Sequence, residues 1–107
     1  MVVVPAYNEG RALGAVLCDL KRLLSAESII VVDDASTDDT TAVARQHGVR
    51  LVQHAINRGQ GAALATGLQA GLQLGAQVLV TFDADGQHQA DDIPALVEPI
   101  LQNQAQV

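Results

Sequence analysis

Residues 78–88, VLVTFDADGQH, contain an apolar run followed by two carboxylates and a glycine. The first five of these residues are β-branched, aliphatic or aromatic, and they predict a buried strand. Asp83 and Asp85 stand where this strand ends and where Gly86 allows the chain to turn. Carboxylates in this position suit Mg²⁺ or Mn²⁺. An isolated Asp-x-Asp is also typical of a polar turn whose carboxylates cap backbone amides, so the rest of the chain must decide between the two interpretations.

The composition predicts one compact domain. The chain has 107 residues, of which 49% are hydrophobic, and this suits a single core. No stretch reaches the roughly 18 apolar residues of a membrane span, and no leader precedes the first strand. We therefore expect no membrane span in the chain and a cytoplasmic location, at the cytoplasmic face of the membrane if the full protein has an anchor. The single cysteine, Cys18, excludes an internal disulfide and is predicted to lie in the core.

The charge pattern argues against nucleic acid as a partner. The formal net charge is −6, and the six Lys and Arg residues form no cluster. Tyr7 and Phe82 are the only aromatic residues, so a stacking platform for bases is missing. An acidic protein that binds an anionic nucleotide has to offset the charge with a divalent cation and with backbone amides. This requirement agrees with the metal interpretation of the Asp-x-Asp motif.

Strand-like and helix-like segments alternate four times along the chain. Apolar runs at residues 1–4, 28–32, 49–52 and 78–82 predict short strands, and residues 12–24, 38–47, 62–74 and a segment from about residue 91 predict helices. Strands that are continuously apolar and separated by helices are typical of a parallel sheet covered on both faces. The sequence therefore predicts an α/β fold with a doubly wound, mostly parallel, Rossmann-like sheet of four βα units.

Local signals predict some of the element ends. Pro5 is expected to end the first strand because it lacks a ladder donor. Ser36 and Asp39 have the spacing of a capping box for the second helix. Glycines at positions 67, 71 and 75 are expected to let the third helix lie close to the sheet, which compensates for their low helix propensity.

Polar clusters follow all four predicted strands. They lie at residues 8–9, 33–34, 57–61 and 83–88. In an open parallel sheet, ligands bind outside the carboxyl ends of the strands, and these four clusters all fall at that edge. The connections at the opposite edge carry few groups suited to chemistry. We therefore expect a ligand site at the carboxyl edge of the sheet.

Each cluster also has a structural alternative. Asp33 and Asp34 either cap the second helix or accept hydrogen bonds from a base and a ribose. Residues 57–61 resemble a phosphate loop because their glycines free backbone amides, although the spacing of a P-loop or dinucleotide fingerprint is incomplete. His47 and His54 are interpreted as surface residues, and His88 as a neighbour of the acids.

Read together, the four clusters closely resemble the successive motifs of the family-2 glycosyltransferases. The matching segments are VPAYNE at residues 4–9, VVDDASTD at 31–38, NRGQGAA at 57–63 and DADGQH at 83–88. They are most similar to the branch of dolichyl-phosphate mannosyltransferases and other polyprenyl-phosphate sugar transferases, and they cover essentially the whole chain. The resemblance implies a GT-A fold, a nucleoside-diphosphate sugar as donor, Mg²⁺ or Mn²⁺ as cofactor, and inversion at the anomeric carbon.

The same resemblance implies which residues bind. The implied nucleotide site comprises Pro5, Ala6, Tyr7, Glu9, Asp33, Asp34, Arg58, Gly59, Gly61 and Asp83. Asp34 would lie at the base, and the implied metal ligands are Asp83, Asp85 and Gln87. Gln60 stands where the family often has a lysine, so Arg58 is the alternative source of positive charge on the diphosphate.

Family catalytic domains are longer than this chain. We therefore expect residues 1–107 to form the single nucleotide-sugar-binding portion of a C-terminally incomplete domain. The acceptor surface and any general base would lie elsewhere, with a polyprenyl phosphate as one implied acceptor. Uncovered apolar surface and a free sheet edge predict self-association.

Two other classes share parts of this pattern. Receiver domains and haloacid-dehalogenase-type phosphatases are phosphorylated on an aspartate at a strand end, but both need a lysine late in the chain. The only lysine here is Lys21, in the first predicted helix. A non-catalytic nucleotide-binding fragment is the third alternative.

Overall fold

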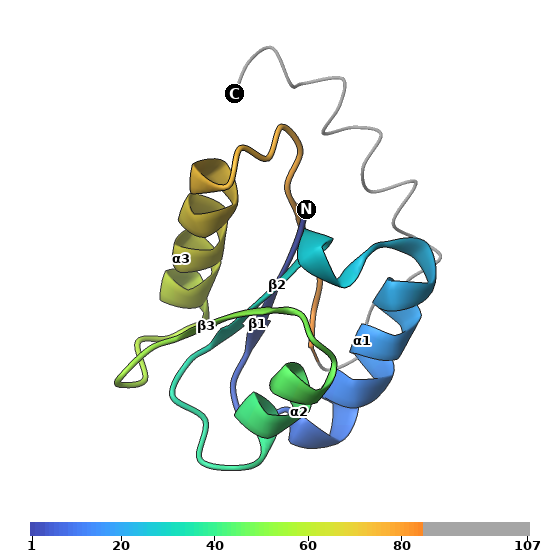
Figure 1. Cartoon of the computed structure of the whole chain (residues 1–107). Helices are drawn as coiled ribbons and strands as arrows, with labels where there is room; N and C mark the ends of the chain where they lie inside the picture. Colours follow the sequence, from blue (N-terminus) through green and yellow to red (C-terminus); the bar gives the residue numbers. More distant parts are fainter. Residues whose placement is uncertain (85–107) are drawn as a thin grey trace.

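The computed structural model describes residues 1–84 as a parallel sheet with helices on both faces (Figure 1). Its elements are β1 (Val2–Ala6), α1 (Gly10–Leu23), the 3₁₀-helix η1 (Ala26–Ser28), β2 (Ile29–Asp33), α2 (Thr40–Gln46), β3 (Arg50–Gln53), α3 (Gln60–Gln73) and β4 (Val80–Thr81). The strand order is β3-β2-β1-β4, and every pairing is parallel. The predicted α/β fold is confirmed through the fourth strand, and the helix predicted from about residue 91 lies outside the described residues.

The core has two layers, one on each face of the sheet. Adjacent residues of a strand point to opposite faces. Val4 of β1 therefore packs in the same cluster as Leu17 of α1, whereas Val3 packs with Ala63 of α3. Figure 1 shows α1 and α2 on one side of the sheet and α3 on the other. Because both faces are covered, β1 and β2 are apolar at nearly every position and fully buried.

The first strand continues through Pro5, so the prediction that Pro5 ends it is wrong. Pro5 pairs in register with Val32 of β2. The neighbouring strand β4 pairs with β1 only as far as Val3, whose carbonyl accepts from the amide of Phe82. Residues 3 and 5 of β1 direct their backbone groups to the same side. The missing N–H of Pro5 therefore points beyond the end of the β1–β4 pairing, and no ladder hydrogen bond is lost.

The glycines of α3 let this helix approach the sheet closely, as predicted for two of the three. A Cβ on Gly67 would lie 2.2 Å from Cγ1 of Val3, and one on Gly71 would lie 2.4 Å from Cδ2 of Leu79. Gly75 lies beyond the last helical residue and has a φ of +83°, so its role is to turn the chain after the helix.

Replacing Gly67 by alanine is expected to lower the free energy of unfolding by about 1–3 kcal/mol, because the new methyl group overlaps Val3. This loss outweighs the gain in helix propensity of about 1 kcal/mol. Gly61→Ala is the matched control, since a Cβ there meets nothing within 4 Å, and it should stabilise by up to about 1 kcal/mol. Urea unfolding measures both variants. A Gly67→Ala protein as stable as Gly61→Ala would contradict the close approach.

Cys18 is exposed, so the prediction that it lies in the core is wrong. The buried face of α1 is formed by residues spaced three and four apart, including Leu13, Val16, Leu17 and Leu20. Cys18 follows Leu17 directly, and this places its side chain about 100° around the helix axis from Leu17. The apolar stripe of α1 is therefore narrower than the sequence pattern indicated.

Several leucines in the second half of α3 and at its C-cap are exposed on the surface. Leu68, Leu72 and Leu74 belong to this group, with Leu72 58% exposed. Such apolar surface is compatible with self-association, which stays a prediction. No helix formed within residues 1–84 is long and apolar enough to cross a membrane.

Candidate functional site

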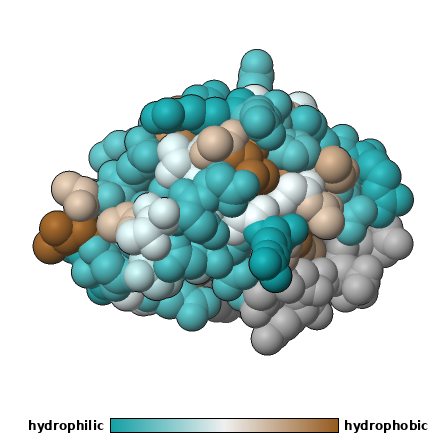
Figure 2. Space-filling view, turned by 90° about the horizontal axis from the view of Figure 1, so that it is seen from below, coloured by the Kyte–Doolittle hydropathy of each residue, from teal (hydrophilic) through white to brown (hydrophobic). Residues whose placement is uncertain are grey.

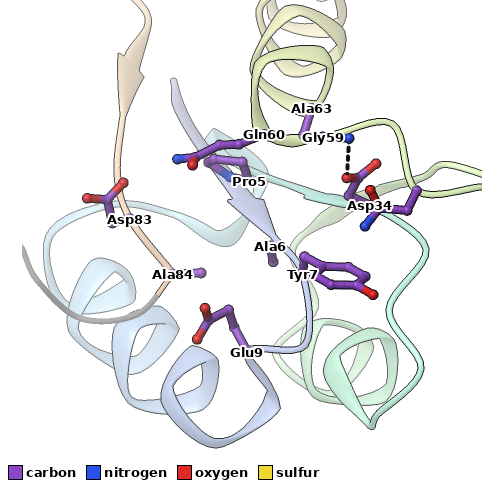
Figure 3. Close-up of a pocket in the computed structure, with 11 residues that line it drawn as sticks. Pro5, Ala6, Tyr7, Glu9, Asp34, Gly59, Gln60, Ala63, Asp83 and Ala84 are labelled. Carbon is purple, nitrogen blue, oxygen red and sulfur yellow. Dashed lines mark hydrogen bonds between the residues drawn. The ribbon is translucent and has the colours of Figure 1, made fainter.

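A pocket of about 600 Å³ opens at the carboxyl edge of the sheet. Its lining comes from the end of β1 and the loop after it, the residue after β2, the loop before α3 with the first turn of that helix, and the residues after β4 (Figure 3). The lining residues are Pro5, Ala6, Tyr7, Glu9, Asp34, Asn57, Gly59, Gln60, Ala63, Asp83 and Ala84. Figure 2 views the molecule from this end and shows a mostly hydrophilic surface with a smaller hydrophobic area near its centre. The pocket therefore lies at the edge where the sequence predicts a ligand.

The carboxylate of Asp34 accepts three hydrogen bonds at the wall of the pocket. Only 2% of the residue is exposed, yet its Oδ1 accepts from the amide of Arg58 at 2.8 Å and from Nδ1 of His54 at 2.7 Å. Its Oδ2 accepts from the amide of Gly59 at 2.7 Å, the bond drawn in Figure 3. Burial acts to raise the pKa of Asp34, but the two amides and His54 together outweigh it and lower the pKa below its ordinary value. Asp34 is therefore a fixed, charged carboxylate at neutral pH.

His54 lies inside the protein, so its interpretation as a surface residue is wrong. Its side chain is 6% exposed, and its Nε2 lies 2.8 Å from Oγ1 of Thr66 on α3. The backbone amide of His54 donates to the carbonyl of Asp33, which extends the pairing of β3 with β2. Since Asp33 pairs with Gln53, one further residue on each strand brings Asp34 opposite His54. This register, which the sequence around His54 does not show, places the ring beside Asp34.

Asp33 serves the loop that leads to α2. Its Oδ1 accepts from the amide of Ser36 at 3.0 Å, and its Oδ2 accepts from the hydroxyl of Thr41. Asp33 and Asp34 are adjacent at the end of an extended strand, so their side chains point in different directions. Of the two adjacent acids, Asp34, which the resemblance places at the base, lines the pocket, and Asp33 bonds to the segment that leads into α2 and to Thr41 of that helix.

Hydrogen bonds connect the loop after β1 to the segment after β2. The amide of Asn8 donates to Oγ of Ser36 at 2.9 Å, and Oδ1 of Asn8 accepts from the amide of Thr37 at 2.8 Å. The amide of Glu9 donates to Oγ1 of Thr40 at 3.0 Å. Asn8 adopts a φ of +52°, a conformation that asparagine tolerates better than most residues. These bonds hold Glu9 and the preceding Tyr7 at the rim of the pocket.

The predicted capping box of α2 is wrong. The N-cap of α2 is Asp39, and it makes no side-chain capping bond. Ser36 instead accepts from the amide of Asn8 in the neighbouring loop. Asp38, which precedes the N-cap, accepts from the amide of Thr40 at 2.9 Å and also from the hydroxyl of Thr40. The side-chain bond from Thr40 is the largest cause of the lowered pKa of Asp38.

Not all backbone amides of the loop at residues 57–61 are available to a ligand. The amides of Arg58 and Gly59 donate to Asp34, so they hold the loop in place. Gly59 has a φ of +96°, which L side chains rarely adopt, and it is the N-cap of α3. Gln60, the first helical residue, lines the pocket. The loop therefore brings the start of α3 to the pocket.

The structure gathers seven of the residues implied for the nucleotide. They are Pro5, Ala6, Tyr7, Glu9, Asp34, Gly59 and Asp83. Asp33, Arg58 and Gly61 do not appear in the lining that the described residues form. The residues implied by the resemblance do not include the lining residues Asn57, Gln60, Ala63 and Ala84, although the polar cluster predicted at residues 57–61 contains the first two. All four lie inside or directly beside the motifs, so the missing information was the direction of each side chain.

The metal motif is only partly within the described residues. Asp83 follows β4 and lines the pocket, whereas Asp85 and Gln87 lie outside residues 1–84. Among the described residues, no three His, Cys, Asp or Glu side chains are grouped as a metal site. Glu9, Asp34 and Asp83 are the acidic side chains of the described lining, which contains no Lys or Arg. In Figure 3, Asp34 and Asp83 lie on opposite sides of the pocket, as expected from β2 and β4 flanking β1.

Comparison with known proteins gives a consistent result. The family profile described as Glycosyl transferase family 2 matches residues 1–107. An uncharacterised protein of Methanocaldococcus jannaschii is 44% identical over 100 residues, which cover 94% of this chain and 41% of that protein. The UDP-N-acetylglucosamine–dolichyl-phosphate N-acetylglucosaminyltransferase of Methanococcus voltae is 35% identical over 117 residues, which cover 94% of this chain and 46% of that enzyme.

The fold also matches a solved enzyme. Glucosyl-3-phosphoglycerate synthase of Mycobacterium tuberculosis, in complex with Mn²⁺, UDP and glucosyl-3-phosphoglycerate, aligns with a TM-score of 0.78 and 32% sequence identity. The alignment covers 94% of this chain and 38% of the synthase. The chain thus spans less than half the length of the relatives it matches.

Proposed function

Because the chain belongs to glycosyltransferase family 2, we propose that it is the donor-binding part of an inverting glycosyltransferase that uses a UDP-sugar. Family membership decides against the receiver-domain and phosphatase alternatives. The observation that carries the proposal is the pocket at the carboxyl edge of the sheet, in which a fixed carboxylate, Asp34, faces Asp83 across the end of β1. The whole enzyme's substrates and activity remain part of the proposal.

Asp34 supports recognition of a base that carries an imide N–H. A carboxylate has about four lone-pair directions, and protein donors occupy two on Oδ1 and one on Oδ2. Within residues 1–84, one acceptor direction on Oδ2 is left for a ligand. The N3–H group of uracil donates, whereas cytosine has an acceptor at that position, so Asp34 favours uracil over cytosine. The relative from M. voltae is named for a UDP-sugar, and the M. tuberculosis synthase was solved with UDP.

The pocket also requires a cation for the diphosphate. Its described lining has three carboxylates and no basic side chain, so an unscreened diphosphate would be repelled. Asp83, together with Asp85 and Gln87, would hold Mg²⁺ or Mn²⁺ through the oxygen ligands that these ions prefer. When bound there, the ion would stabilise the negative charge that builds on the leaving diphosphate. The first turn of α3, which starts at the pocket with Gln60, would add backbone amides without helical partners.

The proposed reaction is a single in-line displacement. An oxygen of the acceptor forms a bond to the anomeric carbon of the sugar while the bond from that carbon to the diphosphate breaks, and UDP leaves. A polyprenyl phosphate suits this reaction as acceptor because its nucleophile is already anionic and needs little base catalysis. The enzyme of M. voltae is named for such a lipid phosphate. The role of this chain is to bind the donor and fix its orientation.

Calorimetric titration with UDP tests the proposal. We expect Mn²⁺ to raise the affinity for UDP at least about tenfold over EDTA-treated protein, because the cation offsets the acidic lining. UDP should also bind more tightly than CDP. Equal UDP affinity with and without metal would contradict the proposal. If the chain alone releases sugar from a UDP-sugar, it is an active portion of the enzyme. If it does not, the chain is a fragment that only binds nucleotide.

A further inference from the structure

We propose that His54 and Thr66 form a positioning pair that holds the carboxylate of Asp34 in the orientation needed to recognise the base. This inference rests on the proposed function, and it assigns a role to two residues outside the pocket lining. His54 would act only through Asp34, without touching the nucleotide. It is therefore a positioning residue and not a catalytic one.

Three separate segments meet at this pair. Asp34 directly follows β2, His54 directly follows β3, and Thr66 lies within α3. Nδ1 of His54 lies 2.7 Å from Oδ1 of Asp34, and Nε2 lies 2.8 Å from Oγ1 of Thr66. Both ring nitrogens are thus in use, and the ring links the sheet to the helix that borders the pocket. The side chains of His54 and Asp34 are 6% and 3% exposed, so water competes little for these bonds.

The donor directions at the pair are set by chemistry. An ionised carboxylate only accepts, so Nδ1 of His54 must carry a proton and donate it to Asp34. In a neutral ring, Nε2 then accepts from the hydroxyl of Thr66. In a charged ring, Nε2 donates to the same oxygen, because a threonine hydroxyl can act in either way. Asp34 therefore keeps its imidazole donor in both states of His54.

The pair has a specific consequence for the base. The amides of Arg58 and Gly59 hold one oxygen each, and both come from the same loop, so they would allow the carboxylate to shift with that loop. His54, the residue that directly follows β3, supplies a third donor from a different segment. With all three bonds formed, the open acceptor direction on Oδ2 is fixed, and it can select a base that donates an N–H.

Three variants separate the contributions of the pair. In His54→Asn, the side-chain amide can replace the Nδ1 donor but cannot reach Thr66, whereas His54→Leu removes both bonds. Thr66→Val keeps the shape of the side chain and removes only the partner of Nε2. We expect His54→Leu to weaken UDP binding in the presence of Mn²⁺ about tenfold and to bring the UDP-to-CDP affinity ratio close to one. His54→Asn and Thr66→Val should each lower the ratio about threefold, because both keep a donor to Asp34 and both lose the contact between residue 54 and Thr66.

Pyrophosphate with Mn²⁺ is the matched ligand control, because it has no base. Its affinity should be the same in the wild type and in all three variants. If His54→Leu fails to fold, as judged by thermal unfolding, Thr66→Val decides: a wild-type UDP-to-CDP ratio in that variant overturns the inference. If the wild type itself shows no metal-dependent UDP binding, the proposed function and this inference fall together. If the wild type prefers UDP and folded His54→Leu keeps that preference, only the positioning role fails.

The ring protonation of His54 gives a test that needs no nucleotide. Long-range ¹⁵N–¹H spectra of the imidazole distinguish a proton on Nδ1 from one on Nε2. We expect Nδ1 to be protonated, whether Nε2 is protonated or not. A neutral ring with its proton on Nε2 alone would leave Nδ1 without a hydrogen beside the carboxylate, and this result would overturn the inference.

Discussion

Asp34→Asn is expected to weaken UDP binding about 100-fold, and it is expected to lower the free energy of unfolding by about 2–4 kcal/mol. The carboxylate accepts three bonds in a site that is 2% exposed. An asparagine keeps one acceptor oxygen and places N–H donors where the second oxygen was. At least one buried donor would then lack an acceptor, and the base would meet a donor instead of an acceptor. Calorimetry and urea unfolding measure the two effects separately.

Asp33→Asn is the matched control for this substitution. Asp33 is the preceding residue, is equally buried at 2% exposed, and accepts from Ser36 and Thr41. We expect Asp33→Asn to lower the free energy of unfolding by a similar amount. It should retain UDP affinity within about threefold, because Asp33 bonds to Ser36 and Thr41 and does not line the pocket. An equal loss of UDP binding in the two variants would contradict this division and return Asp33 to the nucleotide site.

The same carboxylate makes stability depend on pH. The pKa of Asp34 in the folded protein lies below its ordinary value of 3.8, so folding favours the ionised form. Its contribution is fully present above about pH 3.8 and is lost as the pH falls through the lower folded pKa. Asp38, whose pKa is lowered from the same ordinary value, acts in the same direction. Urea midpoints from about pH 7 to about pH 3 should decline less steeply in Asp34→Asn than in the wild type.

The sheet and its ligand edge were predictable because both depend on local sequence. Continuous apolar runs mark buried parallel strands, and polar residues that follow each run necessarily meet at one edge. The place of His54 was not predictable in this way. Its burial depends on the register between β3 and β2, in which Asp33 pairs with Gln53. That register comes from packing between segments 20 residues apart, and a polar residue after a short strand otherwise suggests the surface.

Local signals failed where another segment competed for the same group. Ser36 has the spacing of a capping residue, but the amide of Asn8 uses its hydroxyl. Apart from the family resemblance, the sequence pattern did not distinguish Asp33 from Asp34, because one residue of uncertainty in the strand end exchanges their directions. Once Asp33 is the last residue of β2, the choice is made, and Asp34 is the acid that faces the pocket.

Asp83→Asn is expected to abolish the gain in UDP affinity that Mn²⁺ provides. The ratio of the affinity with Mn²⁺ to the affinity in EDTA should fall from at least about tenfold to about one. Asp83 lies two residues after β4 and lines the pocket across β1 from Asp34. The variant has a further signature in EDTA. The lining formed by residues 1–84 has three carboxylates and no basic side chain, so removing one carboxylate reduces the repulsion of the diphosphate, and metal-free UDP binding should stay equal or become tighter. A variant that had merely lost its pocket would bind more weakly in both conditions.

Glu9→Gln separates a metal ligand from a general charge effect. Glu9 also lines the pocket and also carries a carboxylate, so this variant reduces the negative charge by the same amount. If Asp83 acts as a ligand, Glu9→Gln keeps a clear Mn²⁺ dependence even where its UDP affinity changes. Asp85→Asn should behave like Asp83→Asn, because both acids of the Asp-x-Asp motif are needed to hold the ion. Loss of the Mn²⁺ effect in all three variants would instead show that the cation acts only as a counter-ion for the acidic pocket.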